Sequence, residues 1–190
     1  LPVVPTAGTQ TLRTRGTTCA QLGYAEYVPP GYASATKTPL IIAFHGDGQR
    51  GNGTSDLELI KGDGLPAQIA SDTWDPKHRF IVLAPQMTSD QRTAVNVRDF
   101  LAFAMSTYKV DPQRVYLTAL SGGGGALYRY LEAYGGARIA AIVPISAVYT
   151  FEQRTCMWSD VPVWFFHGAS DTTVTPGNSN VPFTDIQKCA

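Results

Sequence analysis

Three positions in this sequence carry groups that acyl transfer needs, and each follows an apolar run of the kind that forms a buried strand: Ser121, Asp47 and Asp171. A serine can attack a carbonyl carbon, a carboxylate can orient a catalytic histidine, and a backbone N–H can stabilise the oxyanion that forms. Sites on open parallel sheets lie beyond the carboxyl ends of the strands. We therefore expect these three positions to meet at one edge of a sheet.

Ser121 is followed directly by four glycines. A sharp strand-to-helix turn can lift a serine above a sheet, and it demands small residues two positions before and after. Ala119 and Gly123 meet that demand, although glycine is usual at both positions. The N–H of Gly122, at the start of the next helix, is one expected oxyanion donor. We expect Gly124 and Gly125 to keep the approach to the serine open; the alternative for the whole stretch is a plain glycine-rich turn.

A second glycine-rich loop, FHGDGQRGNG, follows an early strand. It can aim another backbone N–H at the same oxyanion, and Asp47 is the best candidate donor. His45 precedes the turn and is expected to hold the loop rather than to transfer protons. Arg50 and Asp56 could bind substrate or pair with each other.

Asp171 lies four residues after His167 and fifty after Ser121. The interval holds a helix, a strand, a short helix and a strand, so the acid would lie two strands beyond the serine. This position fits a catalytic triad whose members follow one another along the chain as serine, acid and histidine. The alternative for Asp171 is an aspartate that caps a turn. His167 stands before a glycine, as His45 does, and we expect it to shape its loop.

Strands and helices are predicted to alternate along the chain. The predicted strands cover 24–32, 39–46, 79–86, 114–120, 138–147 and 161–168, and helical spacing appears in 57–71, 95–110, 123–134 and 149–156. This alternation predicts one α/β domain over 1–190, a three-layer sandwich with a mainly parallel sheet and helices on both faces.

Composition limits the partners. The sequence has 15 basic and 15 acidic residues and no basic tract, and no apolar run is long enough for a membrane helix, so we expect neither nucleic acid binding nor membrane insertion. Its histidines and cysteines show no metal-ligand spacing, and we expect no metal and no cofactor. Low charge with many Gly, Thr, Tyr and Pro residues favours a secreted or extracytoplasmic protein. Three cysteines permit one disulfide and leave one odd thiol, and Cys156–Cys189 is the preferred pair. Asn52 opens a glycosylation sequon, which matters only in a secreting eukaryote.

The chain resembles the α/β-hydrolase superfamily, and within it the secreted serine esterases of the predicted peptidase/phospholipase, feruloyl esterase and polyhydroxybutyrate-depolymerase-like group. The resemblance rests on PLIIAFHGDGQRGNG, FIVLAPQ, VDPQRVYLTALSGGGGALYRYL, AAIVPISA and VPVWFFHGASDTTV. It implies Ser121 as nucleophile, Asp171 as triad acid, and backbone donors at Asp47 and Gly122. It also implies a small-molecule or polysaccharide-linked ester as substrate.

The resemblance also implies a catalytic histidine after one further helix and strand, and no histidine follows His167. Three explanations are open: the sequence stops short of the histidine and of the final strand, a second chain supplies it, or the protein is a non-catalytic relative. We favour the first, because the other catalytic parts are intact.

The leading functional hypothesis is a serine esterase. The alternatives are a non-catalytic carbohydrate-binding or structural module on a hydrolase fold and, more weakly, a serine peptidase, since the same triad cleaves amides. Trp74, Tyr149 and Trp158 could stack on a sugar or an aromatic acyl group, with ordinary packing as the alternative.

Overall fold

The structure is a computed structural model that describes residues 2–149 and 154–189. Within those residues a six-stranded sheet has the order β1-β2-β4-β3-β5-β6. The strands are Gln10–Arg13 (β1), Tyr24–Tyr27 (β2), Thr38–Phe44 (β3), Ile81–Pro85 (β4), Val110–Leu120 (β5) and Ala141–Ile145 (β6). Strands β3 to β6 are parallel to one another, whereas β2 pairs antiparallel with both β4 and β1 at one side of the sheet. The predicted mainly parallel sheet is therefore confirmed.

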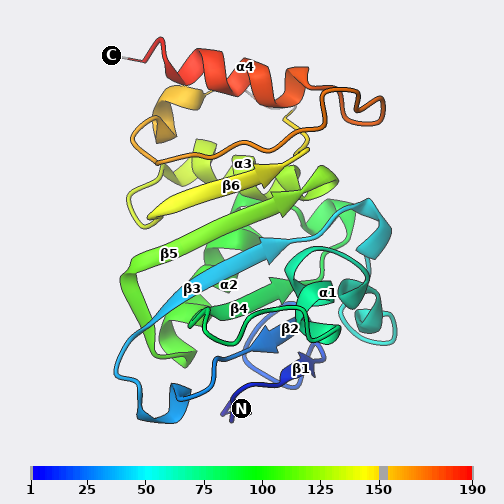
Figure 1. The fold of residues 1–190 in the computed structure, drawn as a ribbon, viewed down its shortest axis with the longest axis vertical. Helices are drawn as coiled ribbons and strands as arrows, with labels where there is room; N and C mark the ends of the chain where they lie inside the picture. The colour runs from blue at the N-terminus through cyan, green and yellow to red at the C-terminus, as the bar shows by residue number, and fades with distance from the viewer. Residues whose placement is uncertain (1, 150–153, 190) are drawn as a thin grey trace.

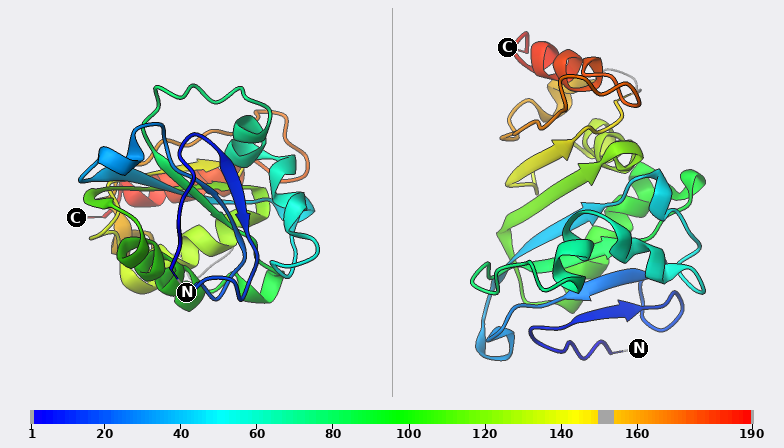
Figure 2. Two further views of the ribbon diagram at one scale, coloured as in Figure 1. Left: turned by 90° about the horizontal axis from the view of Figure 1, so that it is seen from below. Right: turned by 45° about the vertical axis from the view of Figure 1, so that its right-hand side comes forward.

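Helices cover both faces of this sheet, which confirms the predicted three layers. The α-helices are Gly64–Ala70 (α1), Ala94–Thr107 (α2), Gly124–Tyr134 (α3) and Gly177–Ile186 (α4). Short 3-10 helices are Tyr32–Ser34 (η1), Asp47–Gln49 (η2), Leu57–Gly62 (η3), Ser89–Gln91 (η4), Ser121–Gly123 (η5) and Thr155–Trp158 (η6). Helix α1 lies in front of the sheet and α2 and α3 lie behind it (Figure 1). Strand β1 and helix α4 mark opposite ends of the molecule (Figure 2).

The core forms where apolar rows cross the parallel strands. The register aligns Leu83, Ile42, Leu117 and Ile142 across β4, β3, β5 and β6. All four are at most 1% exposed and belong to the cluster that also includes the buried residues of α2 and α3. Because side chains alternate along a strand, the intervening residues point to the other face, towards α1.

One predicted element differs from the structure, and a second can be compared only in part. The run 161–168 is not a regular strand, although it follows β6 in parallel: the N–H of Ile142 donates to Pro162 O at 2.9 Å, and the N–H of Phe166 donates to Pro144 O at 3.0 Å. Two prolines in this paired stretch lack N–H donors, which interrupts the ladder. The predicted helix 149–156 lies partly outside the described residues.

Boundaries also shift at several ends. Strand β2 stops at Tyr27, shortly before Pro29 and Pro30, which cannot donate to a ladder. The helix predicted over 95–110 ends at Thr107, because Val110 already pairs with Thr38 as the first residue of β5. Strand β1 was not expected from the sequence, because its four residues QTLR are too short and mixed to show a period.

The predicted disulfide is present and joins Cys156 to Cys189, 33 positions apart. It ties η6 to the segment just after α4. No helix among the described residues is both long and apolar enough to cross a lipid bilayer.

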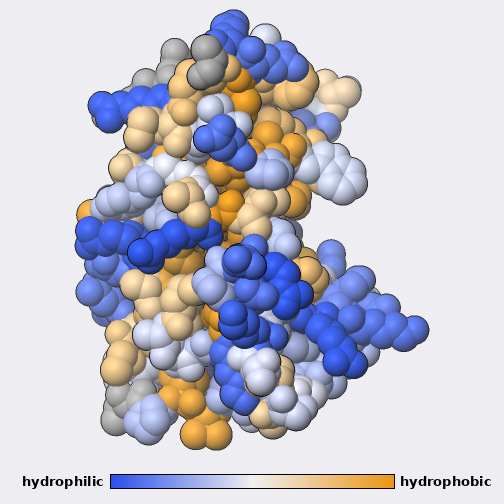
Figure 3. Space-filling view, turned by 90° about the vertical axis from the view of Figure 1, so that its left-hand side faces the viewer, coloured by the Kyte–Doolittle hydropathy of each residue, from blue (hydrophilic) through white to orange (hydrophobic). Residues whose placement is uncertain are grey.

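The face of the sheet beside α1 carries an open groove of about 700 Å³. Its floor comes from β3, β5 and β6, including Ile41, Tyr116 and Val143, and one wall comes from the start of α1. Figure 3 shows the molecule hollowed on its right-hand outline, which is the side that faces the viewer in Figure 1. One end of the groove reaches His45 and Leu120, next to the carboxyl edge of the sheet.

Candidate active site

Ser121 stands at a tight turn between β5 and α3. Its φ of 50° lies in the left-handed region, which is costly for a residue with a side chain. Strand β5 ends at Leu120, and the 3-10 turn η5 begins at Ser121 itself. Its carbonyl accepts a hydrogen bond from the Val148 N–H at 2.8 Å, which joins the turn to the chain beyond β6. The serine is therefore half-buried at the carboxyl edge, ahead of a helix N-terminus, as a nucleophile turn requires.

The glycines after Ser121 are needed because backbone passes close on every side. A β-carbon on Gly123 would stand 2.5 Å from Phe44 O, and one on Gly124 would stand 2.4 Å from Val148 O. Gly124 is buried against this backbone, so it does not widen the approach to the serine as the sequence led us to expect. The turn can lie this close to β3 and β6 only because side chains are absent.

The loop after β3 lies against the serine turn. A β-carbon on Gly46 would be 3.6 Å from Ser121 Cβ, and one on Gly122 would be 2.1 Å from Asp47 Oδ1. The structure thus brings Asp47, Gly122 and Ser121 together at one edge, as the sequence predicts. The role of the two backbone N–H groups as oxyanion donors stays a prediction.

Arg92, which the sequence analysis did not single out, is bound to this loop. Its guanidinium forms an ion pair with the Asp47 carboxylate and donates to His45 O at 3.2 Å and to Gly46 O at 3.1 Å. The hydrogen bond from Arg92 lowers the pKa of Asp47. A lone arginine in a polar connection has no sequence signature, because its partners lie 45 to 47 positions away and come close to it only in the folded chain.

His45 holds the loop. Its Nδ1 lies 2.6 Å from Gly46 O, and its Nε2 accepts a hydrogen bond from the Met87 N–H at 3.0 Å. The carbonyl can only accept, so Nδ1 carries the proton of the neutral ring. Burial lowers the pKa of His45 to about 4. With both ring nitrogens engaged, the geometry supports the expected structural role.

His167 is engaged in the same way. Its Nε2 lies 2.7 Å from Val174 O and its Nδ1 lies 2.7 Å from Ser179 Oγ. The ring joins the turn after 161–168 to the start of α4. The loop-shaping role expected from the sequence agrees with these contacts.

Asp171 is fixed at the same turn. Its Oδ1 accepts hydrogen bonds from the N–H groups of Val174 at 3.0 Å and Thr173 at 2.9 Å, which lower its pKa. The run before it follows β6 in parallel, so Asp171 lies after the second strand position along the sheet from the strand that ends before Ser121. The Asp171 carboxylate also caps its turn, so both interpretations from the sequence fit its contacts.

The third histidine lies elsewhere. His78 precedes β4 and so stands at the amino edge of the parallel strands, where it packs on Trp74 with ring centroids 4.9 Å apart. Of the chain's three histidines, His45 and His167 each hold a loop, and His78 stands at the opposite edge of the sheet. Both ring nitrogens of His45 and of His167 are thus engaged by groups other than Ser121.

The three aromatic candidates for substrate contact separate into two kinds. Tyr149 and Trp158 are 7% and 1% exposed and both pack on Tyr128, with ring centroids 4.8 Å and 5.8 Å away. Their burial favours the packing alternative for these two rings. Trp74 instead lines the open groove.

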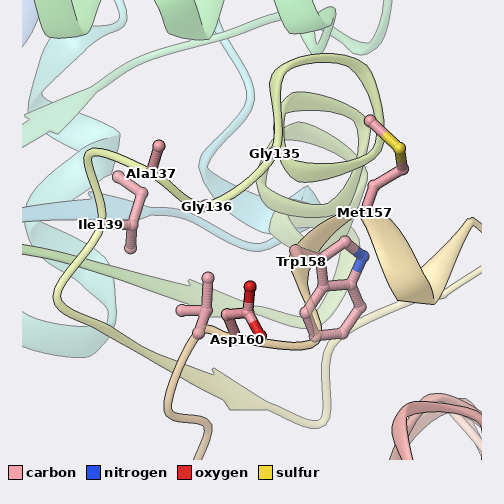
Figure 4. A pocket seen from close by; sticks show the side chains of 8 residues that line it. Gly135, Gly136, Ala137, Ile139, Met157, Trp158 and Asp160 are labelled. Carbon is pink, nitrogen blue, oxygen red and sulfur yellow. The ribbon is translucent and has the colours of Figure 1, made fainter. Parts of the chain in front are cut away.

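Away from this edge there is a smaller hollow of about 380 Å³ at the other end of α3. Figure 4 shows the Trp158 ring and the Asp160 carboxylate lining it opposite the turn at Gly135 and Gly136. Among the described residues, no group of three or more histidine, cysteine or acidic side chains could hold a metal ion.

No protein-family model matches the chain. A curated relative, poly(3-hydroxyalkanoate) depolymerase C from Paucimonas lemoignei, is 24% identical over 216 residues, which cover 87% of this chain and 48% of the depolymerase. The chain thus spans about half the length of this relative.

Solved structures show the same fold. A thermostable esterase matches with a TM-score of 0.66 and 22% identity, over 94% of this chain and 51% of that protein. Acetyl xylan esterase from Aspergillus awamori has a TM-score of 0.64 at 18% identity, over 95% and 80%. Esterase 2 from Thermogutta terrifontis, phosphoramylated by tabun, has a TM-score of 0.63 at 14% identity, over 97% and 81%. The chain therefore has the α/β-hydrolase fold that the sequence predicted, and the solved structures that share this fold include esterases.

Proposed function

We propose that the protein is a serine hydrolase that cleaves carboxylic esters through an acyl-enzyme. One observation carries the proposal: Ser121 has a φ of 50° at the carboxyl edge of the parallel sheet, with the loop after β3 packed against it. A strained serine between a strand and a helix is costly to keep, and such strain clusters at functional sites. The fold's esterase neighbours support the same reaction class.

In the proposed reaction, Ser121 Oγ bonds to the ester carbonyl carbon while its proton passes to a histidine. The carbonyl oxygen becomes an oxyanion held by the N–H groups of Asp47 and Gly122. The C–O bond to the alcohol then breaks, and the histidine returns the proton to the leaving oxygen. Water repeats the sequence on the acyl-enzyme and releases the carboxylic acid.

The histidine of this proposal comes from outside the 190 residues, either from a longer natural chain or from a partner chain. Both ring nitrogens of His45 and of His167 are already engaged, and His78 stands at the opposite edge. Asp171 would receive the new ring, since its Oδ1 is fixed by two backbone N–H groups two strand positions from Ser121.

The substrate class is proposed as a small-molecule or polysaccharide-linked ester. The depolymerase and the acetyl xylan esterase among the similar proteins are compatible with an ester on a polymer. The Cys156–Cys189 disulfide supports a secreted or extracytoplasmic location, because disulfides persist in oxidising compartments.

The test is turnover of a p-nitrophenyl acyl ester and of an aminoacyl anilide by the protein at its natural length. We expect hydrolysis of the ester, little hydrolysis of the anilide, and loss of at least roughly a thousandfold in Ser121→Ala. Faster anilide cleavage would favour the peptidase alternative.

A second candidate, a non-catalytic binding module on this fold, is favoured by the positions of the three histidines. Specific glycan binding together with no ester turnover, in the protein at its natural length, would support that candidate.

A further inference from the structure

Arg92 is almost fully buried, at 6% exposure, and its backbone is fixed on both sides. It directly follows η4, whose Thr88 and Gln91 form a reciprocal capping box. It directly precedes Thr93, which caps α2 by accepting from the Asn96 N–H at 3.1 Å. The backbone position from which the Arg92 side chain extends is therefore well defined.

The Arg92 guanidinium binds three consecutive residues of the loop after β3. Nη2 donates to His45 O and Gly46 O at 3.2 and 3.1 Å, and Nη1 pairs with the Asp47 carboxylate. A planar guanidinium with several donors in fixed directions suits this arrangement, and a lysine ammonium does not. Arg92 thus fixes two carbonyl groups and one side chain of the loop together.

The contact with Gly46 O has a consequence for the neighbouring amide. The carbonyl of Gly46 and the N–H of Asp47 belong to one planar trans peptide unit, so their directions are opposed. A donor that fixes the carbonyl also fixes the direction of the Asp47 N–H. His45 Nδ1, 2.6 Å from the same oxygen, adds a second constraint.

Arg92 also reaches the serine turn. A β-carbon on Gly122 would stand 2.6 Å from Arg92 Nη1, so the ion pair fills the space between the loop and the turn. The Arg92 carbonyl accepts a hydrogen bond from Arg129 Nη1, on α3, at 2.7 Å. One residue therefore joins the β3 loop, the start of α2 and the helix behind Ser121.

We propose that Arg92 is a positioning residue that sets the Gly46–Asp47 peptide unit as an oxyanion donor; this rests on the proposed function. Its role is indirect, because it acts through the amide of Asp47 and not on substrate.

The test compares Arg92→Lys and Arg92→Gln with wild type at natural length, and Arg114→Lys serves as a control. Arg114 is also paired with an aspartate, but it lies half-exposed on β5, well away from Ser121. Removing one oxyanion donor costs about 10²–10³-fold in kcat, and a misplaced donor should cost less than a missing one. We therefore expect a loss of about 10- to 100-fold in kcat for both variants, with KM changed by less than about threefold. The control should retain wild-type kinetics.

A second readout separates positioning from general support of the structure. A thionoester develops charge on sulfur, a weaker hydrogen-bond acceptor, so misplaced donors should cost less on a thionoester than on its matched oxoester. We expect the oxo-to-thiono rate ratio to fall in both Arg92 variants and to stay constant in Arg114→Lys.

The outcomes are distinct. Turnover in wild type that depends on Ser121, with kcat of Arg92→Lys within about twofold of wild type, overturns this inference alone. An unchanged oxo-to-thiono ratio, or variants that lose their cooperative thermal transition, overturns it in favour of a purely structural role. Absence of Ser121-dependent turnover in wild type removes the proposed function, and this inference with it.

Discussion

The Asp47 carboxylate lies directly over Gly122: a β-carbon added to that glycine would stand 2.1 Å from Asp47 Oδ1. The two residues come from connections after different strands, β3 and β5, and their backbone N–H groups are the proposed oxyanion donors. Their close approach depends on the missing side chain at position 122.

Gly122→Ala should therefore impair catalysis more than folding. The added methyl must displace the Asp47–Arg92 ion pair, and we expect kcat to fall about 10²–10³-fold, the cost of one lost oxyanion donor. The Asp47 side chain is 58% exposed and can swing aside, so the free energy of unfolding should fall by only about 1 kcal/mol. Ester turnover and urea denaturation measure the two effects.

The matched control is Gly48→Ala in the loop after β3, next to Asp47, because a β-carbon there meets no atom within 4 Å. Equal losses of kcat in both variants would show that an added methyl anywhere near Asp47 impairs catalysis, and would contradict the specific role of Gly122.

Asp171→Asn should separate loop structure from catalysis. An asparagine Oδ1 can still accept from the Thr173 and Val174 N–H groups, so the thermal melting temperature should stay within a few degrees of wild type. The charge that would orient and stabilise a histidinium is lost, and we expect kcat to fall about 10⁴-fold. Wild-type turnover in this variant would mean that Asp171 only caps its turn.

His45 should make stability depend on pH. Burial lowers its pKa to about 4 in the folded protein, against about 6.5 when unfolded, so the unfolded state binds more protons between these values. Its contribution is fully present above pH 6.5 and is lost as the pH falls towards 4, by about 3 kcal/mol in total. Urea denaturation of wild type and His45→Gln from pH 4 to 7 tests this. The variant should be less stable at pH 7, with a shallower slope; parallel curves would count against a buried neutral imidazole.

The disulfide should contribute to stability through the loop it closes. Cys156 and Cys189 are 33 positions apart, and closing a loop of that length is worth about 3–4 kcal/mol in the chain-entropy model. Paired Cys156→Ser and Cys189→Ser substitutions should lower the free energy of unfolding by that order. Cys19→Ser is the control, because Cys19 is exposed and outside the disulfide. If all variants unfold at the same urea concentration, the disulfide does not form in solution.

The sequence was most informative where a local pattern of residue types is enough to determine the structural element. Continuous apolar runs predicted β3, β4 and β5, because a strand buried on both faces needs apolar residues throughout. The serine turn was visible because its crowding demands small residues at fixed offsets, and Gly123 and Gly124 are indeed packed against backbone.

Tertiary contacts explain what the sequence did not reveal. Arg92 donates hydrogen bonds to carbonyl groups that lie 46 and 47 positions away in the sequence, and no local pattern predicts such contacts. Tyr149 and Trp158 were ambiguous because an aromatic ring in a loop has the same appearance in sequence whether it faces solvent or Tyr128. The run 161–168 has a strand's composition, yet its Pro162 and the Pro144 of β6 lack N–H donors and leave the ladder incomplete.

The central claim is that Ser121 is an activated nucleophile, and covalent labelling tests it most directly. The protein at its natural length would be treated with a fluorophosphonate and digested, and the modified peptide would be located by mass spectrometry. We predict one adduct, on the Ser121 hydroxyl, that is absent from Ser121→Ala. No adduct under conditions that label a known serine esterase, or an adduct that persists in Ser121→Ala, would contradict the account.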